Sequence, residues 1–128
     1  MSTRPLLSPE ACTPEVAQAR NAFHSGIVAE VAAAVAKDAV VVVGMAVNPH
    51  VKRARKALDA AGIPYTYLGY GGYASKWKER LAVKMWSGWP TFPQVFVKGV
   101  LIGGGDRTAE LVQSGELKRW LEQGPPRA

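Results

Sequence analysis

The chain has 128 residues, of which 48% are hydrophobic and 20% charged, and this composition indicates one ordinary globular domain. No apolar run approaches the ~20 residues that a membrane-spanning helix needs, and the N-terminus lacks the apolar core of a signal peptide. We therefore expect no membrane contact and a cytoplasmic location. The single cysteine, Cys12, excludes an intramolecular disulfide and a cysteine-based zinc site, and two distant histidines give no reason to expect a metal.

The net charge of +6 is concentrated in the middle of the chain, where residues 49–98 carry nine basic and two acidic side chains. This segment therefore predicts a face that binds anions. A nucleic-acid interface would also need aromatic residues interleaved with the basic ones on one sheet or helix. Trp89 instead stands in a proline-containing turn. The charge is therefore the only feature that supports nucleic-acid binding, and we do not expect this function.

The N-terminal part predicts a tail and then a long helix. Residues 1–13 are rich in Ser, Thr and Pro and indicate a flexible tail ahead of a single domain over residues 14–124. Thr13 followed by Pro14 is typical of a helix start, because the side chain caps the first amides and proline suits the first helical position. Apolar residues at helical spacing continue this helix to Ala36.

Two strands and a helix between them are expected next. The β-branched run Val40–Val43 predicts a strand buried on both faces. Asn48 and Pro49 repeat the cap-and-proline signal, and the helix that they start ends at Gly62. The segment Pro64–Leu68 indicates the second strand.

The C-terminal half predicts a helix, a hairpin and two short helices. Residues 74–86 indicate the helix, with an apolar face made of Trp77, Leu81 and Met85. Strands over Gln94–Val97 and Val100–Ile102 flank the two-residue turn Lys98-Gly99. Asp106 is expected to cap a helix through Val112, and a last helical segment follows Gly115 over Glu116–Gln123.

This order of elements indicates an α/β fold. A strand–helix–strand unit gives a parallel pair with a right-handed crossover, and the hairpin adds an antiparallel pair. The result is a four-stranded mixed sheet with helices on both faces, which is the thioredoxin-like arrangement.

Several motifs resemble those of the glutaredoxin family. The stretch Trp89–Gly99 resembles the Trp-Pro-Thr, apolar-Pro-Gln pattern of monothiol glutaredoxins, and Thr91-Phe92-Pro93 is similar to the family's loop with a cis proline. Gly103–Asp106 resembles the Gly-Gly-x-Asp element that binds the γ-glutamyl end of glutathione, and Ser114–Leu117 matches the family's Ser-Gly-Glu-Leu. The resemblance covers Val40 to Leu121, roughly two thirds of the chain.

The resemblance implies a ligand site, and its chemistry can be stated from the residues. An extended loop before a cis proline can pair with a peptide as an added strand, and adjacent glycines let a ligand approach the backbone. The first amides of the following helix suit a carboxylate, while Asp106 suits an ammonium group. The alternative is a glycine-rich turn in which Asp106 serves only as a helix cap. The candidate ligand-binding residues are Arg80, Lys84, Thr91, Phe92, Pro93, Gly104, Gly105 and Asp106.

The same resemblance exposes a departure at the active site. Asn48 and Val51 occupy the positions of the family's cysteines, so the nucleophilic thiol is missing and no catalytic residue is assigned. Asn48 is expected to be an N-cap ahead of Pro49. The family's iron–sulfur cluster uses that cysteine together with glutathione, so we expect no cluster. Met45 replaces the lysine that grips the glycine carboxylate of glutathione, so glutathione binding is expected to be weakened, with Arg80 and Lys84 as replacement cations.

Two functional hypotheses follow. The first is a redox-inactive glutaredoxin-like module that binds glutathione, an extended peptide or a partner protein. The second is a glutathione-dependent oxidoreductase or transferase that uses the thiol of bound glutathione or Cys12. Beside the vacant site, a basic helix face either recognises an acidic ligand or partner protein or is simply solvated. Its members are Lys52, Arg53, Arg55 and Lys56.

Overall fold

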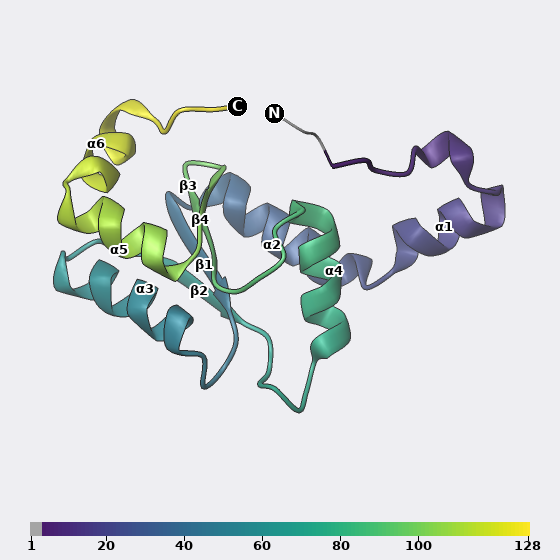
Figure 1. Cartoon of the computed structure of the whole chain (residues 1–128), viewed down its shortest axis with the longest axis horizontal. Coiled ribbons are helices and arrows are strands. Elements are labelled where there is room, and N and C mark those ends of the chain that lie inside the picture. Colours follow the sequence, from purple (N-terminus) through teal and green to yellow (C-terminus); the bar gives the residue numbers. More distant parts are fainter. Residues whose placement is uncertain (1–3) are drawn as a thin grey trace.

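The computed structural model describes residues 4–128 and contains one four-stranded mixed sheet (Figure 1). The strands are β1 (Val40–Gly44), β2 (Thr66–Gly69), β3 (Gln94–Val97) and β4 (Val100–Gly103), in the order β2-β1-β3-β4. β1 pairs parallel with β2 and antiparallel with β3, which pairs antiparallel with β4. Lys98 and Gly99 join the hairpin with φ of 49° and 81°, as a type I′ turn requires. The predicted sheet and hairpin are confirmed.

Helices cover both faces of the sheet, as expected. One face packs against α2 (Ser25–Lys37) and α4 (Trp77–Ser87); the other packs against α3 (Pro49–Ala60), α5 (Gly105–Gln113) and α6 (Glu116–Gln123). Alternate side chains of β1 enter different cores: Val41 and Val43 lie in the first, Val40 and Val42 in the second. All four are at most 2% exposed, so this strand is buried on both faces as its sequence indicates.

The single long helix expected after Pro14 is wrong, because the chain forms two helices there. α1 (Pro14–Ala22) ends before His24, whose left-handed backbone (φ 44°) breaks the helical path, and α2 follows at Ser25. None of the α1 residues is buried, and α1 projects away from the sheet (Figure 1). Ahead of it, the described part of the predicted tail contains one 3-10 turn, η1 (Pro9–Ala11); residues 1–3 of that tail lie outside the described residues.

The apolar face predicted for residues 74–86 is not the buried face of α4. Trp77, Leu81 and Met85 are 59%, 38% and 56% exposed, whereas Ala82 and Val83 are buried. The small apolar side chains Ala82 and Val83 therefore pack against the core, and the three large apolar ones are exposed. Helical periodicity alone does not show which of two apolar faces a neighbouring helix can approach closely.

Removing residues 1–13 should leave the free energy of unfolding within about 0.5 kcal/mol of the full chain, because none of the described residues of this segment is buried. Urea unfolding followed by circular dichroism would measure this. Val31→Ala is the control: its side chain is 0% exposed, so truncation should cost about 2 kcal/mol. A loss of similar size in the truncated chain would contradict the predicted domain start at residue 14.

Candidate functional site

The sheet topology brings three predicted segments to one edge. β1 and β2 end at this edge, β3 starts there, and β4 returns to it. The start of α3, the Thr91–Pro93 loop and the Gly103–Asp106 segment therefore meet. Between them lies an open hollow of about 390 Å³. It is lined by His50, Trp89, Thr91, Phe92, Gly104, Gly105, Asp106 and Arg107.

The loop before β3 has the conformation that its sequence resemblance implied. The Phe92–Pro93 peptide bond is cis, and both residues are buried, while Thr91 is exposed. Sheet pairing of β3 begins only at Gln94, so the loop lies outside the ladder. The fully buried Gln94 donates from Nε2 to the carbonyl of Trp89 at 3.0 Å and so holds the loop in place. The resemblance included Gln94 but gave it no such role.

The two residues that the resemblance assigned to the family's cysteine positions, Asn48 and Val51, both have structural roles. The side-chain oxygen of Asn48 accepts hydrogen bonds from the amides of His50 (2.9 Å) and Val51 (3.1 Å), so the predicted N-cap is confirmed. Asn48 is only 9% exposed, and the Val51 side chain is part of the core. The preceding Val47 has φ 58°, a strained backbone for a β-branched residue, and is 72% exposed. The helix start is thus satisfied without a thiol.

At the start of α5, the cap differs from the expectation. Gly104, with an extended backbone, is the N-cap, and Asp106 lies in the first turn. The predicted cap at Asp106 is wrong because the helix begins at Gly105, before the acidic residue. No side chain caps the first amides of α5 within residues 4–128, whereas the hydroxyl of Thr108 donates back to the Gly104 carbonyl at 2.8 Å.

The two glycines at this helix start have different reasons to be glycine. A Cβ on Gly105 would overlap the carbonyl oxygen of His50 and lie 3.2 Å from its Cα, so α3 and α5 approach each other closely here. A Cβ on Gly104 would meet only the Pro93 carbonyl oxygen, at an ordinary 3.6 Å. Packing of α3 against α5 therefore requires a glycine at position 105. Close approach of a ligand to the backbone can account for the glycine at position 104, where packing does not require one.

Asp106 has a partner within the chain. Its Oδ1 lies 2.5 Å from Nη1 of Arg53 on α3, and the two side chains are 69% and 61% exposed. From the sequence, Arg53 was expected on a basic face and Asp106 in the ligand site, as separate features. They are 53 positions apart, so only the packing of α3 against α5 brings them together.

The two predicted cations of α4 have different surroundings. Arg80 is buried, and its Nη1 donates to the carbonyls of Tyr70 (2.8 Å) and Ser75 (2.5 Å). The Tyr70 hydroxyl donates to Glu30 at 2.8 Å, and burial, together with this hydrogen bond, raises the pKa of Tyr70 well above its ordinary value. Through its two hydrogen bonds to backbone carbonyls, Arg80 anchors the loop after β2. Lys84 lies with its Nζ 5.6 Å from the ring centre of Phe92, next to the predicted loop.

The four residues of the predicted basic face of α3 have different surroundings. Arg53 pairs with Asp106, and Arg55 stacks 3.9 Å from the ring centre of Tyr67 and hydrogen-bonds the Tyr65 hydroxyl at 3.1 Å. That hydrogen bond is the main reason that the pKa of Arg55 is raised. The other two members of the face, Lys52 and Lys56, are exposed.

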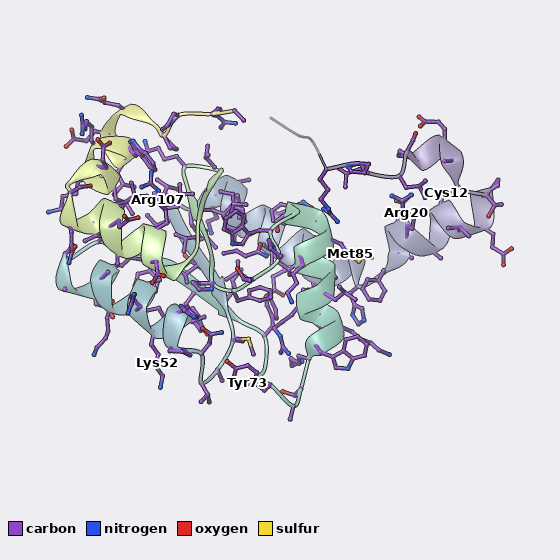
Figure 2. All side chains as sticks on the ribbon, in the orientation of Figure 1. Cys12, Arg20, Lys52, Tyr73, Met85 and Arg107 are labelled. Atoms are coloured by element: carbon purple, nitrogen blue, oxygen red, sulfur yellow. The ribbon has the colours of Figure 1, made fainter. Side chains whose placement is uncertain are left out.

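Cys12 lies on the N-terminal arm with α1, across the molecule from Lys52 at the start of α3 (Figure 2). Nη1 of Arg20 donates to its sulfur at 2.8 Å. In this structure the cysteine therefore lies away from the start of α3. Within residues 4–128, no cluster of three or more His, Cys, Asp or Glu side chains could hold a metal ion.

Comparison with known proteins agrees with this geometry. The family model named Glutaredoxin matches residues 40–102. A glutaredoxin-like protein of Dictyostelium discoideum is 46% identical over 105 residues, which are 82% of this chain and 85% of that protein. The chain belongs to the glutaredoxin family. A probable monothiol glutaredoxin of Legionella pneumophila is 41% identical over 69 residues, covering 54% of this chain and 74% of its own length.

Solved glutaredoxins share the fold. Oxidized glutaredoxin 2 from Chlamydomonas reinhardtii superposes with a TM-score of 0.67 at 28% identity, covering 78% of this chain and 94% of its own. The buckwheat glutaredoxin–glutathione complex gives a TM-score of 0.65 at 23% identity, covering 78% and 91%. The thioredoxin-like fold expected from the sequence is confirmed. Among the described helices of this glutaredoxin, none is long and apolar enough to cross a membrane.

Gly105→Ala should destabilise the protein by about 1–3 kcal/mol, because its Cβ would overlap the His50 carbonyl and force α3 and α5 apart. Thermal and urea unfolding would measure the loss. Gly104→Ala is the matched control, since its Cβ makes only an ordinary contact and its φ is −104°. Equal stability of the two variants would contradict the packing role of Gly105.

Proposed function

We propose that this glutaredoxin is a redox-inactive binding module whose ligand is glutathione or an extended peptide segment of a partner protein. The proposal depends mainly on the position and hydrogen bonds of Asn48. It stands at the position of the family's nucleophile, and its amide oxygen is engaged by the two amides at the start of α3. An amide cannot attack a disulfide, so the usual thiol chemistry has no starting group here.

The binding half of the proposal rests on the neighbouring loops. The Thr91–Pro93 segment lies outside the β3 ladder and next to the hollow, where a peptide could add to it as a strand. The first amides of α5 would receive a carboxylate, with Lys84 beside Phe92 as a predicted cation for a second one. The buckwheat relative has been solved as a complex with glutathione, which makes glutathione the first ligand to test.

Two features support weak binding of glutathione. Met45 stands where the family carries a lysine for the glycine carboxylate, and its side chain is only 6% exposed in the core. Arg80, the other proposed replacement, already binds two backbone carbonyls. Without the active-site thiol, the chain also lacks its own ligand for an iron–sulfur cluster, so the proposal includes none. An acidic partner protein that contacts Lys52 and Lys56 is compatible with the same site.

Titration with reduced glutathione, followed by amide NMR shifts, should give saturable shifts around Phe92 and Gly104–Asp106. Asp106→Ala should change these shifts and alter the affinity, because its carboxylate is a charged side chain that lines the hollow. Trp120→Phe, on α6 and not among the residues that line the hollow, serves as the control for a general effect of substitution. The absence of any shift at millimolar glutathione would leave only the peptide or partner protein as ligand.

The alternative, an enzyme that uses the thiol of bound glutathione or Cys12, is tested through the missing nucleophile. The wild type should show no glutathione-dependent reduction of a small mixed disulfide, and Asn48→Cys should gain it, because a helix start lowers the pKa of a thiol and exposes the thiolate. Cys12→Ser should behave as the wild type. Turnover by the wild type would establish the enzymatic alternative; its loss in Cys12→Ser would assign the reacting thiol to Cys12, and its persistence would assign it to bound glutathione.

A further inference from the structure

We propose that Arg53 makes the hollow beside Asp106 selective for a carboxylate without a neighbouring ammonium group, which disfavours the amino-acid end of glutathione. The inference rests on the proposed function, since it concerns the ligand class of the same site. It starts from the 2.5 Å contact between Nη1 of Arg53 and Oδ1 of Asp106.

Asp106 is the only acidic side chain that lines the hollow within residues 4–128. A zwitterionic ligand would place its ammonium group against this carboxylate. Arg53 already holds that position and is tethered to α3, so the incoming ammonium must compete with an intramolecular cation. The pair therefore offsets the one negative charge that could favour an ammonium group at this place.

The remaining groups around the hollow favour an anion. α3 and α5 both begin here, and their N-terminal ends carry partial positive charge toward the same space. The first amides of α5 have no side-chain cap among the described residues. Arg107, which also lines the hollow, is 3.7 Å from Glu110 and half exposed. With Asp106 neutralised, a carboxylate meets donors and positive potential, and an ammonium group meets no free acid.

The ligand class that fits is a carboxylate on a chain that can also lie along the Thr91–Pro93 loop. An acidic side chain of an extended peptide and a C-terminal carboxylate share this chemistry. Lys52 and Lys56, exposed on the same helix as Arg53, extend the positive surface beyond the hollow. The selectivity therefore agrees with an acidic protein segment as the natural occupant.

The test compares glutathione with glutaryl-cysteinylglycine, which differs only in lacking the amino group. Dissociation constants from NMR titration of the full chain should show the desamino compound binding about two- to fivefold more tightly than glutathione, the range that an exposed ion pair can supply. In Arg53→Gln, Asp106 is free to receive the ammonium group, so the ratio should fall to about one or invert. Because both ligands are measured on the same variant, a change in its stability cancels from the ratio.

Lys118→Gln is the control, with the same change of charge at an exposed position of α6 that does not line the hollow; its ratio should equal that of the wild type. Tighter binding of glutathione than of the desamino compound by the wild type would overturn the inference. An equal ratio in Arg53→Gln and wild type would also overturn it. No binding of either compound at millimolar concentration would instead overturn the binding of small glutathione-like ligands on which the inference rests.

Discussion

The burial of β1 on both faces is the constraint on which the rest of the structure depends. Its four valines send alternate side chains into the two cores, so each layer of helices is held against the same strand. β1 also pairs on both sides, with β2 and β3, and its end at Gly44 leads directly to the start of α3. A Cβ at Gly44 would lie 2.8–3.2 Å from side-chain atoms of Val51 and Tyr67. The last residue of β1, where the chain leaves the sheet, therefore has room only for glycine. The position of the start of α3 beside the hollow follows from this exit.

The first amides of α3 are satisfied by the side chain of Asn48, which carries no thiol. In family members that use the thiol, the partial positive charge of the helix start stabilises a thiolate. Here the same amides are satisfied by a neutral oxygen, which stabilises the helix locally and gives no chemistry. The cis-proline loop and the start of α5 line the same hollow as the start of α3.

Much of the fold was predictable because the decisive signals are local. A β-branched run, a capping asparagine before proline, and a Lys-Gly turn each specify their own segment, and the resemblance supplied the cis bond at Pro93. What could not be predicted depends on contacts between distant segments. The ion pair of Arg53 with Asp106, the overlap that excludes a side chain at Gly105, and the carbonyls bound by Arg80 all require the packed tertiary structure. The break at His24 was missed because the apolar spacing continues across it, although the backbone does not.

The close approach of His50 and Gly105 also bears on the speed of binding. Because α3 and α5 are in backbone contact at the rim of the hollow, neither helix start can swing outward to admit a ligand without breaking the packing between the two helices. The hollow is therefore preformed. Its backbone is ordered when the protein folds, so ligand binding does not have to order it again. A ligand that fits should associate in a single step without a slow opening, and differences in affinity between ligands should lie in their dissociation rates.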